Sequence, residues 1–310
     1  MNNLVLGRYV SYDSFVHRLD PRNKILILIA LMTMVFFNFS TYEVNFIMQG
    51  MMFLFVLFLM LISHIKLGSF IKSLGPIWII LIIILIINIF IPTSNKDDYG
   101  VMFNLNGFDV YWASLFQALK IAIRVILMIA LTMVLTATTK PLDLTFAFEW
   151  YLTPLKVVHF PAHEIAMTLS IALRFIPTIL TETEKIMKAQ SSRGVDFKHG
   201  RLITKVRALI SLIVPLFVSA FQRSEELADA MEARGYNPRA KRTRYHKLTW
   251  SIFDTFTLIL ILMLLGGVIT TSVMNFTFSL TFILSIIVFI EGLFIVLVLL
   301  GSFYSLRKID

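Results

Sequence analysis

The sequence contains no cysteine and few charged residues. Without cysteine, disulfides, thiolate metal sites and cysteine nucleophiles are all excluded. Charged residues make up 15% of the chain and apolar residues 57%, whereas a soluble domain has about 25% and about 45–50%. A soluble fold of this size would have too few charged side chains to cover so much apolar surface. The composition therefore predicts an integral membrane protein.

Sequence signals for catalysis and nucleotide binding are missing as well. The chain has no Gly-x-x-x-x-Gly-Lys-Ser/Thr loop, so we do not expect it to bind ATP through a Walker motif. Its 6 His show no metal-ligand spacing with a third ligand, and catalytic residue types do not cluster near one membrane face. We therefore expect no catalytic residue, no metal site and no cofactor bound by this chain.

Six apolar runs have the length and composition of membrane-spanning helices, although two are short. They cover residues 25–40, 44–63, 76–92, 113–138, 253–273 and 278–301. A spanning helix needs about 20 mostly apolar residues, and the lack of water in the bilayer favours helix even in the Ile-rich third run. The sequence thus predicts an all-α integral membrane protein that spans the bilayer about six times.

Basic residues are distributed unevenly in this arrangement. If residues 1–24 lie inside the cell, the inner segments contain 25 of the 28 Lys and Arg residues, and the outer loops contain only Lys96. Cytoplasmic loops carry such an excess of basic residues. We therefore predict that both termini are cytoplasmic. We assign the net charge of +9 to this asymmetry and expect a lipid bilayer, not nucleic acid, as the partner.

A long segment separates the fourth and fifth runs. It divides an N-terminal membrane domain, residues 1–138, from a C-terminal membrane hairpin, residues 253–310. Residues 139–252 between them are too apolar and too periodic for a disordered loop. We expect this segment to form a separate domain of long helices, cytoplasmic or interfacial in position.

Two long helices are predicted within this segment, at about 162–193 and 203–235. Each has an apolar first part and a charged last part, so the apolar part can contact the membrane while the charged part projects into the cytoplasm. Pro177 and Pro215 lie inside the two helices and are expected to kink them.

The two predicted helices end in related sequence. Both fit the pattern Glu-x4-Ala-x3-Arg-Gly with an offset of 41 residues: Glu184, Ala189, Arg193 and Gly194, then Glu225, Ala230, Arg234 and Gly235. Residues four apart share one helix face, so the small alanine leaves the arginine uncovered. An Arg-Gly end is typical of an ordinary helix cap. A capping arginine at a projecting tip is also well placed to pair with an acidic partner.

These tips and other stretches resemble the transmembrane T components of energy-coupling factor (ECF) transporters. The similar stretches are A-Q-S-S-R-G (Ala189–Gly194), M-E-A-R-G-Y (Met231–Tyr236), H-R-L-D-P-R-x-K (His17–Lys24), T-T-x-P-x-D-L (Thr138–Leu144) and L-R-F-I-P (Leu173–Pro177). The resemblance runs from residue 17 to about residue 238. One departure is Ser192, where the family often has alanine. Because serine is also small, we expect little loss of fit.

The resemblance implies a coupling and scaffold subunit of an ABC importer in the bacterial cell membrane. In that family two crossing helices dock on two cytoplasmic ATPases, which bind ATP and magnesium. A separate membrane subunit, the S component, holds the vitamin or other micronutrient. By position, the docking residues would be Ala189, Ser192, Arg193 and Gly194 at one tip, and Ala230, Ala233, Arg234 and Gly235 at the other. The chain itself would not be an enzyme.

Three other functions compete with this one. A self-sufficient ion-coupled transporter would use Arg124 and Glu291, which we otherwise interpret as a structural intramembrane pair. Such a transporter predicts symmetry among its spans, and the sequence shows none. A membrane-embedded enzyme needs a catalytic cluster, which is missing. An ordinary ABC permease subunit usually presents one short coupling helix, not two long ones with Arg-Gly tips.

Overall fold

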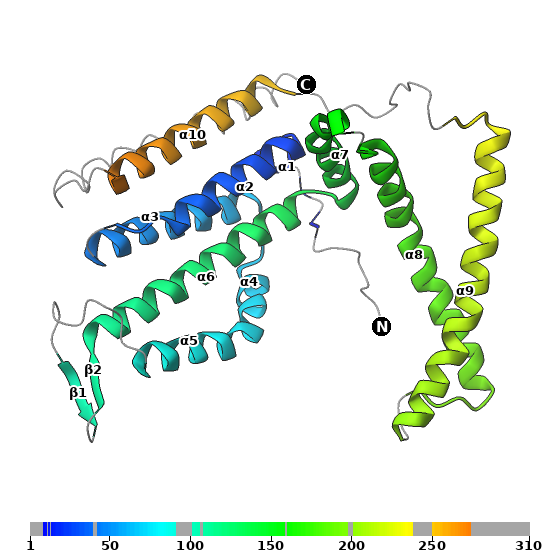
Figure 1. Ribbon diagram of the computed structural model, residues 1–310, viewed down its shortest axis with the longest axis horizontal. Coiled ribbons are helices and arrows are strands. Elements are labelled where there is room, and N and C mark those ends of the chain that lie inside the picture. Colours follow the sequence, from blue (N-terminus) through cyan, green and yellow to red (C-terminus); the bar gives the residue numbers. More distant parts are fainter. Residues whose placement is uncertain are drawn as a thin grey trace. The chain divides into compact units, whose positions relative to one another are not determined.

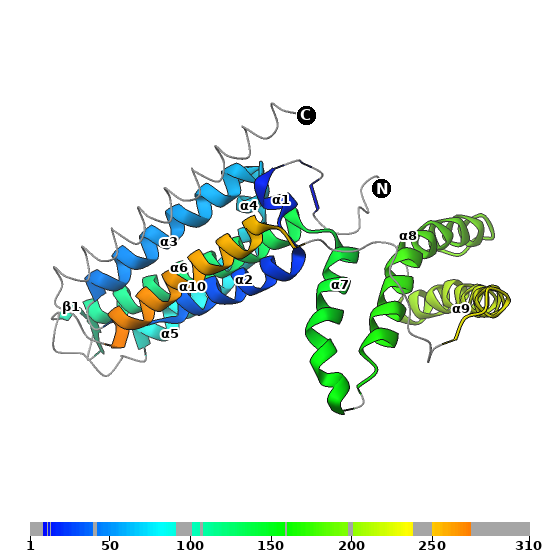
Figure 2. The ribbon, with the colours of Figure 1, turned by 90° about the horizontal axis from the view of Figure 1, so that it is seen from above.

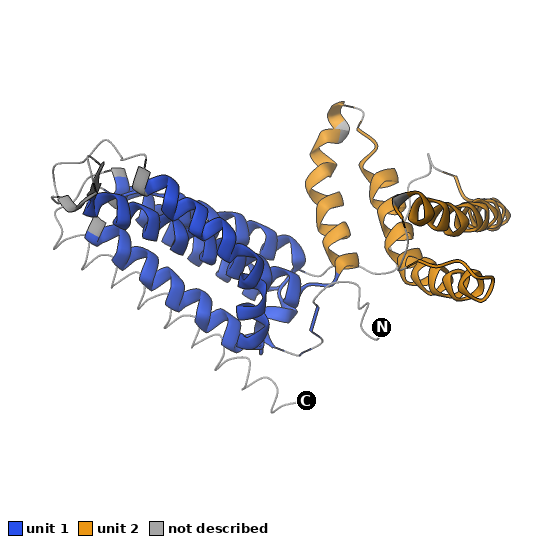
Figure 3. Ribbon diagram, turned by 90° about the horizontal axis from the view of Figure 1, so that it is seen from below, with its two compact units in different colours: residues 1–140, 248–310 blue, residues 141–247 orange. Residues whose placement is uncertain are grey.

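Helices make up nearly all of the structure. The computed structural model describes residues 9–10, 12, 14–39, 42–90, 101–105, 108–158, 160–197, 201–237 and 250–273. The chain divides into two compact units: unit 1 is residues 1–140 with 248–310, and unit 2 is residues 141–247 (Figure 3). The chain therefore passes between the units twice, after residue 140 and before residue 248.

Six helical segments of the described chain are long and apolar enough to cross a membrane. They are Glu43–Ile62, Leu67–Asn88, Trp112–Thr138, Ala162–Ser192, Ile203–Ala233 and Ile252–Thr270. Four of them lie at predicted spans, and the other two are the long helices predicted between the fourth and fifth spans. The chain is thus an all-α, multi-pass membrane protein, as the composition predicts.

Unit 1 contains most of these helices around one apolar core. Its helices are α1 (Phe15–Arg18), α2 (Pro21–Phe36), α3 (Tyr42–Ile62), α4 (Leu67–Leu74), the 3-10 turn η1 (Gly75–Ile77), α5 (Trp78–Phe90), α6 (Trp112–Thr138) and α10 (Ile252–Val273). α2 packs against α6 and α10, while α3 and α5 pack against α6 (Figures 1 and 2). Val56, Met60 and Leu127 are among the most buried core side chains. The core therefore centres on α6.

The first predicted span is shifted in the structure. α2 has 16 residues and begins at Pro21, not at residue 25. The Asp20 carboxylate accepts a hydrogen bond from the Arg22 amide at 2.9 Å and so caps the helix, with proline at its first position. Burial raises the pKa of Asp20, and the Arg22 amide counteracts this. Apolarity marks the membrane-embedded part of a helix but not its cap. The sixth predicted span, 278–301, lies outside the described residues.

A β-hairpin occupies part of the predicted outer loop at 93–112. β1 (Val101–Leu105) pairs antiparallel with β2 (Phe108–Tyr111). The sequence between the strands is Asn106-Gly107, which is a strong hairpin signal between apolar runs. Our prediction counted only charges in this stretch and missed that signal.

Buried polar side chains gather at the beginning of α10. The fully buried Asn23 amide donates to the Asp254 backbone oxygen at 2.8 Å and to the Thr257 hydroxyl at 2.9 Å. The Asp254 carboxylate accepts from the amides of Asp20 at 2.9 Å and Ser251 at 2.8 Å. The beginning of α2 is thereby bonded to the beginning of α10.

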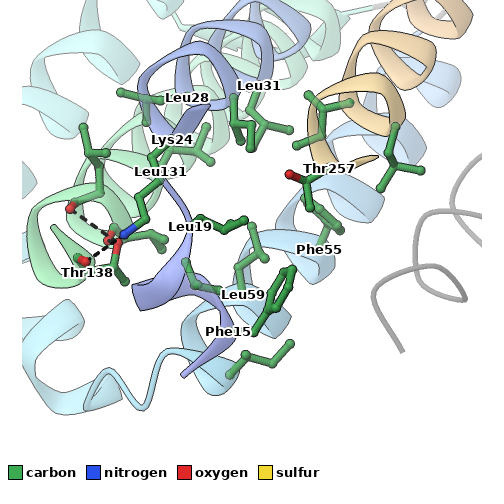
Figure 4. A pocket seen from close by; sticks show the side chains of 17 residues that line it. Phe15, Leu19, Lys24, Leu28, Leu31, Phe55, Leu59, Leu131, Thr138 and Thr257 are labelled. Carbon is green, nitrogen blue, oxygen red and sulfur yellow. Dashed lines mark hydrogen bonds between the residues drawn. The ribbon is translucent and has the colours of Figure 1, made fainter. Parts of the chain in front are cut away.

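The end of α6 is bonded to the same part of α2. The Lys24 ammonium donates to the backbone oxygens of His17 and Thr138, both at 3.0 Å, beside the apolar cavity in Figure 4. The Val10 amide donates to the Ala137 oxygen at 3.0 Å. The last carbonyls of a helix have no partner within it, so these donors satisfy groups that would otherwise be costly to bury.

Replacing Lys24 by methionine would remove the donor for two carbonyls while keeping much of the side-chain volume. We expect Lys24→Met to lower the free energy of unfolding by about 1–3 kcal/mol, because a buried acceptor loses its partner. Thermal unfolding of the detergent-purified protein measures the change. Lys72→Met is the control, since Lys72 is exposed in the last turn of α4. Equal melting temperatures would show that Lys24 does not hold the end of α6.

Candidate functional site

Unit 2 is built around two long helices. It contains α7 (Pro141–Leu152), the 3-10 segment η2 (Thr153–Val158), α8 (Ala162–Ser192) and α9 (Leu202–Ala233). α8 and α9 lie within one or two residues of the predicted bounds. α8 packs against α7 and α9, and Figure 1 shows that α8 and α9 cross with opposite chain directions.

Both long helices end in the same hydrogen-bonded cap. In each, the glycine amide donates to a carbonyl three residues back and the next amide to a carbonyl five residues back. The pairs are Gly194–Ser191 (3.0 Å) and Val195–Gln190 (3.1 Å) in α8, and Gly235–Glu232 (2.8 Å) and Tyr236–Met231 (2.9 Å) in α9. This is the Schellman motif, which places a left-handed residue just past the helix end. The two glycines fill that position with φ of +88° and +71°.

The motif arginines project from these caps. Arg193 and Arg234 directly precede the glycines, and both are exposed. Neither guanidinium has a hydrogen bond or ion pair within the described parts of the chain. The other predicted tip residues are exposed too: Ala189 and Ser192 in α8, and Ala230 and Ala233 in α9. The structure thus brings each predicted set together at one tip, where an uncovered guanidinium can bind a carboxylate through two parallel hydrogen bonds.

The departure at Ser192 does not change this arrangement. Its hydroxyl donates to the Lys188 backbone oxygen at 3.1 Å, one turn back along the same helix. The side chain therefore stays against its own helix and leaves the Arg193 guanidinium uncovered.

A second charged group joins the helices where they cross, and our sequence analysis missed its role. The Glu182 carboxylate on α8 accepts hydrogen bonds from the Ser219 hydroxyl and the Arg223 guanidinium on α9, the latter at 2.9 Å. The Arg223 guanidinium also lies 5.9 Å from the centre of the Phe175 ring. Glu182 and Arg223 have opposite charges and the same 41-residue offset as the tips. That coincidence is the signal that could have found them.

The first halves of both long helices expose apolar side chains. On α9 they include Val206, Ile210, Val214 and Phe217, each more than half exposed. Residues spaced by three or four lie on one helix face, so these side chains form an apolar stripe. Pro177 and Pro215 lie inside α8 and α9, and both helices continue past them. Kinks at these prolines stay a prediction.

Arg124 bonds to the end of a neighbouring helix in unit 1. Its Nε donates to the Val35 backbone oxygen and its Nη2 to Asn38 Oδ1, both at 3.0 Å, and its guanidinium lies 5.4 Å from the Phe36 ring centre. A cation at the carboxyl end of α2 is favourable for the helix dipole. Glu291 lies outside the described residues, so its pairing with Arg124 stays a prediction.

Comparison with known proteins identifies relatives over most of the chain. A family model described as cobalt transport protein (CbiQ) matches residues 13–245, which include both tips. The energy-coupling factor transporter transmembrane protein EcfT of Staphylococcus aureus is 41% identical over 261 residues, or 84% of this chain and 94% of that protein. The proteins of the same name from Streptococcus thermophilus and Bacillus subtilis are 43% and 40% identical over 267 residues each. Those matches cover 85% of this chain and 97% and 96% of the two relatives.

Alanine at either capping glycine should loosen the corresponding tip. A left-handed conformation costs a residue with a side chain about 1–2 kcal/mol, so we expect Gly194→Ala and Gly235→Ala to weaken the caps by about that amount. Hydrogen exchange of the last-turn amides should become several-fold faster in each variant. Gly68→Ala is the control, because Gly68 lies within α4 and an added side-chain carbon would meet no atom within 4 Å. Unchanged exchange at the tips would contradict the role of the glycines.

Proposed function

The chain belongs to the family of energy-coupling factor transporter transmembrane proteins, and on that basis we propose that it couples two cytoplasmic ATPases to a substrate-binding membrane subunit. The observation that carries the proposal is the pair of equivalent helix tips, each with an exposed arginine before a left-handed glycine. Two equivalent tips suit two similar partners. The chain would then be the scaffold of an ABC importer for a vitamin or another micronutrient.

Each tip has the chemistry to bind an acidic groove on one ATPase. Arg193 and Arg234 would pair with groove carboxylates, since a guanidinium matches a carboxylate in geometry and charge. A side-chain carbon placed at Gly194 or Gly235 would meet no atom within 4 Å, so the groove wall has room to approach the backbone there. Magnesium and ATP would be bound by the ATPases, because this chain has no Walker loop.

The apolar stripe on α9 suits a membrane partner. Exposed apolar surface of this extent is typical of a protein or lipid contact. Closure of the ATPases around ATP would move the two tips, and the long helices would carry this movement to their apolar first halves. We infer that these halves contact the S component, so that ATP-driven movement reorients it and changes access to its bound substrate.

This function requires unit 2 to face the cytoplasm. The uneven distribution of basic residues supports that orientation, with 25 of 28 Lys and Arg residues in the predicted inner segments. Both termini would then lie in the cytoplasm of a bacterial cell. The charged second halves of α8 and α9 would lie where soluble ATPases can reach them.

Charge reversal at both tips tests ATPase docking. The variant Arg193→Glu with Arg234→Glu should not retain the ATPases of the same cell in a pull-down from detergent, whereas the wild type should. Losing one buried charge pair costs about 2–5 kcal/mol, so each tip alone should weaken binding roughly thirtyfold or more.

The matched control is Lys205→Glu with Arg207→Glu, which makes the same charge change at two exposed positions near the beginning of α9. It should retain the ATPases. A wild type that retains no ATPase would refute the proposed function. Equal retention by wild type and the tip variant would leave the arginines without a docking role.

A further inference from the structure

The 41-residue offset extends beyond the tips to the whole of both long helices. Subtracting 41 from the bounds of α9, 202 and 233, gives 161 and 192, and α8 runs from 162 to 192. The two helices therefore begin within one residue of the same repeat position and end on the same position. α8 and α9 are two copies of one structural element, each ending in the same cap.

Glu182 and Arg223 occupy the same position in these two copies, because 182 plus 41 is 223. Their side chains meet at 2.9 Å where the helices cross. In a contact with two-fold symmetry, equivalent positions meet only at the symmetry axis. The opposite chain directions of α8 and α9 in Figure 1 fit such an axis between the two residues.

The apolar residues beside the pair follow the same symmetry. Phe175 and Ile179 of α8 line the space next to the pair, and so do Leu216 and Ala220 of α9. Adding 41 to 175 and 179 gives 216 and 220, so the two helices use the same face for their contact. A contact through equivalent faces is isologous, as in a symmetric dimer.

Opposite charges at this position distinguish the two copies. Two identical charged residues would repel each other at a symmetry axis, whereas Glu182 and Arg223 attract. The Ser219 hydroxyl and the Phe175 ring add a hydrogen bond and a cation–π contact to the pair. The charges therefore favour α8 with α9 over a pairing of two like helices.

The pair is equally far from both tips. Arg193 is 11 residues past Glu182, and Arg234 is 11 residues past Arg223. At 1.5 Å per residue, each tip lies about 16 Å along its helix from the crossing. The two helix ends are thus arms of equal length about one charged contact.

We propose that the Glu182–Arg223 pair is the pivot of unit 2, which fixes how the two tips are held relative to each other. The proposal deepens the proposed function and rests on it for its consequence in transport: both residues are positioning residues that act through Arg193 and Arg234. Both side chains are partly exposed, at 24% and 30%, and such a pair adds only about 0–1 kcal/mol to stability. Its loss should therefore change geometry and coupling more than folding.

The geometric consequence can be measured on the full chain alone. The sequence contains no cysteine, so spin labels at Lys188→Cys and Asp229→Cys report a single distance between equivalent, exposed positions near the two tips. The distance distribution should be narrow in the otherwise unaltered chain and broader in Glu182→Arg. The charge swap, Glu182→Arg with Arg223→Glu, should narrow it again. An unchanged distribution in Glu182→Arg, or a swap that stays broad, would overturn the proposal.

The functional consequence is measured in liposomes with the ATPases and the S component. Transport per ATP hydrolysed should fall about tenfold in Glu182→Arg, within the usual range for residues coupled in one network, and should recover in the swap. The control Glu226→Arg makes the same charge change at an exposed position three residues from Arg223 and should behave as wild type. Unchanged coupling in Glu182→Arg would overturn the pivot. A wild type that binds no ATPase would instead refute the proposed function and leave the distance result standing.

Discussion

The bonds made by the beginning of α2 fix both places where the chain passes between the units. Lys24 binds the last residue of α6, directly before the chain enters unit 2, and Asn23 binds the first turn of α10, directly after it returns. Helix ends carry backbone groups without intrahelical partners, and a membrane protein has little water to satisfy them. The H-R-L-D-P-R-x-K stretch supplies those partners. A force carried along the chain from unit 2 enters unit 1 at these bonds.

The backbone, and not the arginine, closes the end of each long helix. A C-terminal arginine is often explained as a cap that binds the last carbonyls. Here the amides of Gly194 and Val195 bind the carbonyls of Ser191 and Gln190, and α9 repeats this arrangement. The guanidinium is therefore not needed for the cap and is free to face outward. The left-handed glycine and the projecting arginine are thus two parts of one device, because the first releases the second.

The sequence predicted what local patterns determine and missed what depends on contact. Proline, glycine and apolar periodicity gave α8 and α9 nearly to the residue, and the repeated motif gave the eight tip residues as neighbours. The Asn106-Gly107 hairpin signal and the Asp20 cap were legible but overlooked, since hydropathy reports neither. Hydropathy also ranks α8 and α9 with the spans, because it does not record which face is apolar. The meeting of Glu182 and Arg223 required the crossing itself.

A weak contact is sufficient for a strong effect on coupling. An exposed ion pair contributes little to the folded state, since solvent screens its charges. A pivot does not need a large binding energy, because the apolar faces around it already hold the helices together. It needs to penalise other crossing positions, and about 1.4 kcal/mol makes an alternative tenfold rarer. Opposite charges on equivalent positions meet this need, since sliding either helix by one turn separates Glu182 from Arg223 while leaving apolar residues in contact.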